Sequence, residues 1–144
     1  MVARNEARLI RRCAELMELH AGITGRYIVT DFFKGTTTEF YEQIFDQLKD
    51  LAVSILVNNV GIGHVTASTG FGGANIKNVL DQTLVNMVLQ VLITKILFKT
   101  LNARRNHKSI VIDISSLASL PKITNENLYN ANKTFNREFT AFYP

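Results

Sequence analysis

The sequence predicts an α/β protein with a doubly wound parallel sheet, and two observations carry that prediction. Along the 144 residues, segments of helical periodicity alternate with short apolar segments of strand character, in the order helix, strand, helix, strand, helix, strand, helix. The strand segments are apolar on both faces, which is typical of parallel sheets that helices cover on both sides. Right-handed crossovers then bring the carboxyl ends of the strands to one edge, where α/β folds bind ligands.

The first half of the chain supplies two helices and one strand. Residues 5–20 carry apolar side chains at helical spacing, with Asn5 as a plausible N-cap and Gly22 as the stop. Residues 25–32 are rich in β-formers and end near an aspartate, so we expect a strand. Residues 36–51 open with threonines and return to helical periodicity. The predicted apolar stripe of the first helix consists of Leu9, Cys13, Leu16 and Leu19 or Met17.

The second half supplies two strands and two helices. Residues 53–63 form a continuous apolar run that passes into asparagines and glycines, and residues 109–116 form a second such run. Between them, residues 76–101 predict one long helix that is apolar over much of its circumference. Its most apolar stretch, 84–98, is shorter than a membrane span and contains polar side chains, so it is interpreted as a buried core helix. Residues 126–142 complete the pattern as a helix.

Composition excludes several classes of protein. The formal net charge is +4, but the basic residues are scattered, so we expect no nucleic-acid interface. Cys13 is the single cysteine, which rules out an internal disulfide bond. The amino-terminal segment is charged and lacks the apolar core of a signal peptide. We expect no metal site and no transmembrane segment.

The residues with the clearest chemistry lie between 112 and 139. Tyr129 and Lys133 are four residues apart and therefore share one face of the predicted helix. An ammonium group close to a phenol favours the phenolate, which lets the phenol exchange a proton with an alcohol or a ketone. Ser115 and Ser116 end the preceding strand, where a hydroxyl could polarise the same oxygen. Such a set supplies a proton but no electron pair, so a hydride donor such as a nicotinamide would complement it.

Each of these features also has a plain structural interpretation. The tyrosine and lysine could form a surface helix pair, and the serines could cap the end of a strand. The combination of these features favours a catalytic site over the structural interpretation. An Asn-Asn-x-Gly sequence ends one strand, the serines end the next, and the tyrosine opens the helix that follows.

Three segments together resemble one known family. "NNVG" (58–61), "IDISS" (112–116) and "YNANK" (129–133), in this order and spacing, resemble the short-chain dehydrogenase/reductase family. The valine of "NNVG", with "VTDFFKG" (29–35), is most similar to the branch of 3-oxoacyl-CoA reductases and hydroxysteroid dehydrogenases. The resemblance covers nearly the whole chain and implies a Rossmann-like fold.

The resemblance implies a catalytic role for four residues. Tyr129 would be the general acid/base, Lys133 would tune it and hold the nicotinamide ribose, and Ser116, thirteen residues before the tyrosine, would orient the carbonyl group. Asn86, in the long helix, would support a proton relay, and its alternative is a structural helix asparagine.

The resemblance also implies a nucleotide site. Asp31 would contact the adenine ring, Asn59 and Gly61 would line the cofactor beside Tyr129 and Lys133, and Arg4 would read the 2′-phosphate, which favours NADP(H) over NAD(H). Asp31 as a strand-end cap and Arg4 as an ordinary surface arginine are the alternatives.

One part of the family pattern has no counterpart here. The family opens with a strand and a Gly-rich turn at which the pyrophosphate approaches a helix N-terminus. The glycines at 61–63 and 70–73 do not follow such a strand, so we interpret them as flexible loop. We therefore expect residues 1–144 to form a partial domain without the first strand and the C-terminal strands, with an open hydrophobic edge, poor stability and no activity in isolation.

Two functions remain open from the sequence. The leading one is an NADP(H)-dependent oxidoreductase that reduces a ketone of 3-oxoacyl or steroid type to an alcohol. The alternative is a catalytically inactive interaction or dimerisation module. The resemblance implies a homo-oligomer through helices 76–101 and 126–142, a cytoplasmic or endoplasmic reticulum location, and membrane contact only through segments not present here. The substrate itself cannot be inferred.

Overall fold

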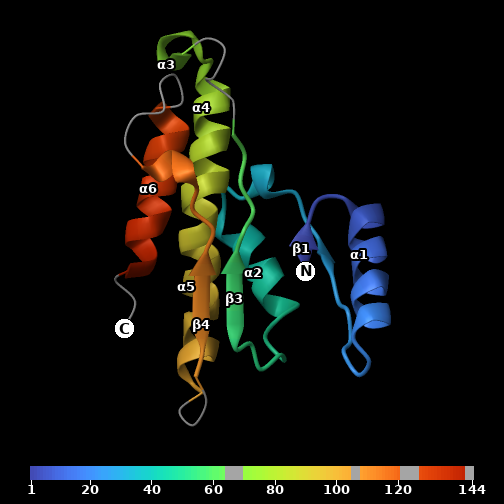
Figure 1. Ribbon diagram of the computed structural model, residues 1–144. Coiled ribbons are helices and arrows are strands. Elements are labelled where there is room, and N and C mark those ends of the chain that lie inside the picture. Colours follow the sequence, from blue (N-terminus) through green and yellow to red (C-terminus); the bar gives the residue numbers. More distant parts are fainter. Residues whose placement is uncertain (64–69, 105–107, 121–126, 142–144) are drawn as a thin grey trace.

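From residue 6 onward, helices and strands follow one another in the predicted order, and a two-residue strand that was not predicted, Val2–Ala3, precedes them. The computed structural model describes residues 1–63, 70–104, 108–120 and 127–141 (Figure 1). The helices and strands are β1 (Val2–Ala3), α1 (Glu6–Leu19), β2 (Ile28–Val29), α2 (Thr38–Asp46), β3 (Ile55–Asn58), α3 (Gly70–Gly73), α4 (Ile76–Thr83), α5 (Leu89–Asn102), β4 (Ile110–Asp113) and α6 (Asn127–Ala141). Short 3₁₀ turns at Phe32–Lys34 and Leu117–Ser119 follow β2 and β4.

The strands form two separate parallel pairs. β1 pairs with β2 in the register Val2↔Ile28, and β3 pairs with β4 from Ile55↔Ile110 to Asn58↔Asp113. The doubly wound parallel sheet is thus confirmed in its incomplete form. The strands are shorter than predicted because a β-formation tendency becomes a strand only where a neighbour completes the hydrogen-bond ladder.

Helices cover one face of the β3–β4 pair in the described part of the chain. α5 contacts both strands and α6 contacts β4. The opposite face exposes five aliphatic side chains, those of Ile55, Val57, Ile110, Ile112 and Ile114. The prediction that helices cover both faces is therefore wrong for the β3–β4 pair within the described residues. An apolar pattern indicates that a face is suited to burial, but it does not supply the element that buries it.

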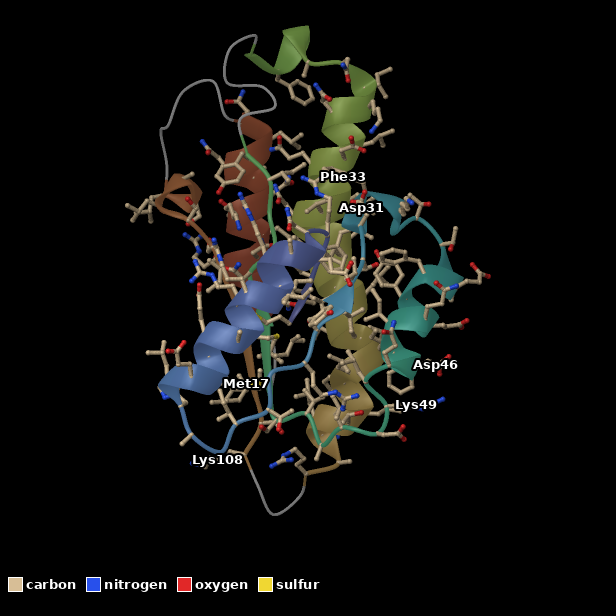
Figure 2. All side chains as sticks on the ribbon, turned by 90° about the vertical axis from the view of Figure 1, so that its right-hand side faces the viewer. Met17, Asp31, Phe33, Asp46, Lys49 and Lys108 are labelled. Carbon is tan, nitrogen blue, oxygen red and sulfur yellow. The ribbon has the colours of Figure 1, made fainter. Side chains whose placement is uncertain are left out.

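Helix α1 begins and ends where the sequence predicts. The Asn5 side chain accepts a hydrogen bond from the Arg8 backbone amide at 2.9 Å, and Gly22 takes a φ of +89° just beyond the helix. The predicted stripe is only half correct. Leu9 and Cys13 are buried, whereas Leu16, Met17 and Leu19 are exposed by 38%, 43% and 72% (Met17 is labelled in Figure 2). The apolar periodicity thus extends past the part of the helix that has a neighbour.

The long helix is continuous from Ile76 to Asn102 but contains a π-helical turn at Leu84–Val88. By length and composition this 27-residue helix could cross a membrane, with a mean hydropathy of 1.6 in its most apolar window, of which 39% is buried. Because core helices of water-soluble proteins meet the same criterion, this is weak evidence for a membrane span. Residues 70–73, expected to be loop, instead form one short helical turn, α3.

The main hydrophobic cluster lies under the first three strands and positions the loops at their ends. It consists of Phe32, Tyr41, Ile44, Val85 and Leu89. Tyr41 also makes a polar contact there, because its hydroxyl donates a 2.8 Å hydrogen bond to the buried carbonyl of Gly35.

Removing the Tyr41 hydroxyl should weaken the fold and change its alkaline behaviour. We expect Tyr41→Phe to lower the free energy of unfolding by about 1 to 2 kcal/mol, because the Gly35 carbonyl loses its partner. Burial raises the pKa of Tyr41 above its usual 10.0. Since the folded state holds this proton longer than the unfolded state, its contribution is complete below pH 10 and is lost as pH rises further. Denaturant titrations of both proteins between neutral and alkaline pH should show a shallower alkaline decline for the variant.

Candidate functional site

Asn86 holds the loop that follows β3. Its side chain is fully buried, and its Oδ1 accepts from the Ile62 amide at 2.8 Å while its Nδ2 donates to the Ile62 carbonyl at 2.7 Å. Asn86 lies in the π-helical turn between α4 and α5, a local distortion that often marks functional positions in helices. Asn86 therefore has a structural role, which was the alternative to a proton relay. Because it fixes Ile62, it also determines where the loop of the candidate site lies.

The side chains of Asn86 and Lys133 both approach the loop at Gly61. A Cβ atom at this position would lie 3.0 Å from Asn86 Oδ1 and 3.4 Å from Lys133 Nζ. Any larger residue would therefore have to push one of these side chains away. Gly63, two residues later, runs beside the Tyr129 ring, which lies 3.4 Å from where its Cβ would be. The loop thus contacts three of the four predicted catalytic residues.

Lys133 extends from α6 through the protein interior to the end of β4. Only 4% of the residue is exposed, and its Nζ donates a 2.7 Å hydrogen bond to the Ile114 carbonyl. Burial lowers the pKa of Lys133 below its usual 10.5, and the nearby charge of Asp113 partly opposes this effect. Nζ lies 5.8 Å from the centre of the Tyr129 ring, so the ammonium group and the phenol share one site.

The two serines after β4 have different roles. Ser115 Oγ donates a 2.7 Å hydrogen bond to the Lys133 backbone carbonyl, which ties the strand end to α6. Ser116 Oγ accepts from the Ala118 amide at 3.2 Å and so caps the 3₁₀ turn that follows. The sequence suggested strand-end capping as one interpretation, and the structure bears it out for Ser116. Capping leaves the hydroxyl proton of Ser116 available for another acceptor.

Three predicted nucleotide-binding residues line one cleft at the strand ends. Arg4, Asp31 and Gly61, which follow β1, β2 and β3, border a cleft of about 480 Å³. Asp31 Oδ1 accepts from the Phe33 amide at 3.2 Å, so the aspartate caps the 3₁₀ turn as well (Figure 2 labels both residues). The Arg4 guanidinium lies 5.6 Å from the centre of the Phe33 ring and is exposed.

Sequence reasoning missed two residues of this cleft. Arg8, one turn into α1, and Phe33 both line it. Arg8 was counted only among the scattered basic residues, and its position relative to Arg4 depends on how α1 leaves β1. Phe33 could have been suggested by its place beside Asp31. With Arg4 and Arg8 on one side, the cleft is suited to an anionic ligand.

Asn59 lies apart from the other predicted nucleotide-binding residues. It is exposed and lines a different cavity, between β1 and β3. Its neighbour Asn58 is buried, and its Nδ2 donates to Thr94 Oγ1 at 3.0 Å and to Asp113 Oδ1 at 2.6 Å. Asp113 in turn accepts from the Thr140 hydroxyl at 2.7 Å, so Asn58 connects β3 to α5, β4 and α6. Sequence reasoning gave Asn58 no role.

The arrangement places the Tyr129–Lys133 pair close to a loop that borders the cleft lined by Arg4, Arg8 and Asp31. Gly61 borders the cleft, and the side chains of Asn86 and Lys133 lie where a Cβ of this residue would be, which links the two parts of the site. A phenol beside a buried ammonium can donate a proton to a substrate oxygen and recover it. Among the described residues, no group of three or more His, Cys, Asp and Glu side chains could hold a metal ion.

Comparisons with known proteins identify the family of the chain. A family model described as short chain dehydrogenase matches residues 1–142. The chain is 26% identical over 136 residues to a very-long-chain 3-oxoacyl-CoA reductase from Anas platyrhynchos, covering 94% of this chain and 42% of that protein. It is 29% identical over 134 residues to 17-beta-hydroxysteroid dehydrogenase type 3 from Mus musculus, covering 88% and 39%. The chain thus spans well under half the length of these relatives.

Solved structures of low sequence identity share the fold. L-Sorbose reductase from Gluconobacter frateurii, solved with NADPH and L-sorbose, superposes with a TM-score of 0.80 at 21% identity, covering 96% of this chain and 50% of that one. A 7beta-hydroxysteroid dehydrogenase superposes with a TM-score of 0.82 at 18% identity, covering 97% and 52%. At these identities the likeness concerns the fold alone, and the fold is Rossmann-like.

Proposed function

Because the chain belongs to the short-chain dehydrogenase family, whose model matches residues 1–142, we propose that its site supports NADP(H)-dependent reduction of a ketone to an alcohol. The observation that carries this proposal is the position of Gly61. Gly61 borders the cleft that Arg4 and Arg8 line, and the side chains of Asn86 and Lys133 lie where its Cβ would be, so a cofactor in the cleft would lie close to Lys133. A nicotinamide cofactor follows from the family, and the choice of NADP(H) is part of the proposal.

Each residue has a distinct part in the proposed reaction. When bound, a reduced nicotinamide supplies a hydride to the carbonyl carbon. The Tyr129 phenol gives its proton to the carbonyl oxygen, and Lys133 lies beside its ring. The Ser116 hydroxyl donates a hydrogen bond to the same oxygen and orients it. Asn86 holds the 61–63 loop against this site, as its two hydrogen bonds to Ile62 indicate.

The charge of the cleft favours a phosphorylated cofactor. Arg4 and Arg8 stand at one side of it, and Asn5 caps the α1 N-terminus between them. A 2′-phosphate would gain charge-assisted hydrogen bonds from this side. Gly61 leaves room where a Cβ would fill the space beside Asn86, so the backbone permits close approach.

The names of the relatives suggest the substrate class. The 3-oxoacyl-CoA reductase and the 17-beta-hydroxysteroid dehydrogenase both handle a carbonyl or hydroxyl group on a large apolar molecule, as their names state. We propose a substrate of the same kind, a 3-oxoacyl or steroid ketone.

A second function is favoured by exposed apolar residues on the long helix. Ile76 and Leu80 are 79% and 63% exposed on consecutive turns of α4. Exposed aliphatic side chains of this kind are suited to contact with another chain, and the second proposed function is to bind one through α4–α5 and α6. In that case the chain keeps the predicted catalytic residues but does not convert a substrate.

Thermal unfolding with each cofactor distinguishes these functions. We expect saturating NADPH to raise Tm, with a stabilisation of about 2.7 kcal/mol at a hundredfold excess over Kd, and NADH to raise it less. Arg4→Ala should weaken NADPH binding by roughly tenfold or more through the loss of a charge-assisted contact, and should leave the NADH shift unchanged.

Two variants serve as controls. Arg11→Ala removes an exposed arginine of α1 that does not line the cleft and should behave as wild type. Tyr129→Phe removes one hydroxyl and should retain the NADPH shift. A wild-type melt that ignores both cofactors would reject the oxidoreductase proposal for this chain and favour the interaction module.

A further inference from the structure

Asp113 is a half-buried carboxylate that has no part in the proposed reaction. It is the last residue of β4 and lies in register opposite Asn58 of β3. Its Oδ1 accepts from Asn58 Nδ2 at 2.6 Å, and its Oδ2 accepts from the Thr140 hydroxyl at 2.7 Å. A carboxamide and a hydroxyl are neutral donors, so they fix the position of the carboxylate without neutralising its negative charge.

Lys133 brings a cation to the same end of β4. Its Nζ donates a 2.7 Å hydrogen bond to the carbonyl of Ile114, the residue that follows Asp113. Thr140 lies seven residues after Lys133, so both side chains start from one face of α6. This face contacts β4 through two neighbouring residues, because the lysine bonds to Ile114 and the threonine bonds to Asp113. The ammonium group and the carboxylate thus meet the same short stretch of β4.

Burial makes the positive charge of Lys133 unfavourable. Only 4% of the residue is exposed, and an ammonium group removed from water loses its proton more readily unless an opposite charge lies near it. Burial lowers the pKa of Lys133 below its usual 10.5, and the charge of Asp113 acts against this effect. Without that carboxylate, the lysine would keep its proton over a narrower range of pH.

Other titratable side chains around α6 do not supply the same charge. Among the described residues, the elements that pack most closely against α6 are α3, α4, β4, the π-helical turn and the 3₁₀ turn after β4. Apart from β4, only α4 carries charged side chains, and its Lys77 and Asp81 form an ion pair with each other. On α6 itself, Arg137 and Glu138 form an exposed ion pair, and Tyr129 is the remaining titratable group. Asp113 is therefore the acidic group placed to act on Lys133.

We propose that Asp113 is the counter-charge of Lys133, and that Asn58 and Thr140 hold its carboxylate in place. A protonated lysine has three donors, of which the Ile114 carbonyl takes one, so two remain for a ligand at the loop after β3. Asp113 acts through Lys133 and is a positioning residue. Its effect on turnover rests on the proposed function, whereas the charge pair is a property of the free chain.

The test is a pH titration of Lys133 in the free chain, followed by NMR of its Cε enriched in carbon-13 and assigned with Lys133→Arg. Asp113→Asn removes the charge and keeps the shape, because a carboxamide can still pair with Asn58 and Thr140. We expect the midpoint of the Lys133 titration to fall by about one pH unit in this variant. Asp113→Thr, whose β-branched side chain suits a strand, is a second neutral variant and should give the same fall.

Two further variants separate the effect of charge from that of packing. Asp46→Asn removes an exposed carboxylate of α2 that pairs with Lys49, so it should leave the Lys133 midpoint unchanged (Figure 2 labels both residues). Thr140→Val removes one hydrogen bond to Asp113 but keeps its charge, so the midpoint should again stay where it is. An unchanged midpoint in both neutral Asp113 variants, or an equal fall in Thr140→Val, would overturn the inference.

The titration contains no cofactor, so this inference and the proposed function fail separately. A chain that ignores NADPH but shows the fall in Asp113→Asn would lose the oxidoreductase proposal and keep the charge pair. A chain whose Tm rises with NADPH while the Lys133 midpoint does not respond to Asp113→Asn would keep the oxidoreductase proposal and reject the charge pair.

Discussion

Asn86→Leu is expected to lower the free energy of unfolding by about 2 to 4 kcal/mol, with little change in side-chain volume. The substitution removes the partner of the Ile62 amide and the partner of the Ile62 carbonyl at once. Each backbone group left unpaired costs about 1 to 3 kcal/mol, and the lower half applies here because Ile62 is half-buried. The 61–63 loop should then lose its fixed position beside Lys133 and Tyr129.

The measurement is a denaturant titration, with hydrogen exchange at Ile62 as the local readout. Asn102→Leu is the matched control, since Asn102 lies on the same long helix and is exposed. Its stability should stay within about 0.5 kcal/mol of wild type. If the two variants were equally stable, the contact between Asn86 and Ile62 would contribute nothing, and its role in shaping the site would be refuted.

Asn58→Leu should destabilise the protein by a similar amount, about 2 to 4 kcal/mol, whereas Asn59→Leu should be nearly neutral. Asn58 donates to the Asp113 carboxylate and to the Thr94 hydroxyl, both inside the protein. Hydrogen bonds to a charged group contribute about 1.5 to 3 kcal/mol, and the neutral contact adds about 1. Asn59 is exposed, so its replacement removes no buried contact.

This pair of neighbours gives a comparison within one Asn-Asn sequence. Urea titrations of the two variants, made under the same conditions, should separate by several times the experimental error. An equal loss in both would mean that the contacts of Asn58 are not those that hold β3 to β4 and α5. The resemblance had assigned Asn59 a cofactor role, and nucleotide binding by Asn59→Leu tests that role separately.

Local patterns of the sequence predicted the order of elements and several of their ends. Asn5 caps α1 and Gly22 takes a positive φ in the turn that follows, because capping and a positive φ depend on residues within one turn. The position of Tyr129 and Lys133 on one helix also follows from local periodicity alone. Strand lengths were overestimated, because a strand exists only where another segment pairs with it, and no local pattern reports that partner.

The sequence by itself determined that this is an α/β chain with a tyrosine, a lysine and a serine at the ends of successive elements, which places it in its family. Only the tertiary structure decided which of two adjacent asparagines is buried, that the side chains of Asn86 and Lys133 both lie close to Gly61, and that Arg8 lines the cleft. The physical reason is that periodicity and capping arise from neighbours along the chain. The contacts of a site instead depend on how distant segments pack, and the same side chain can cap a turn, line a cavity or face solvent.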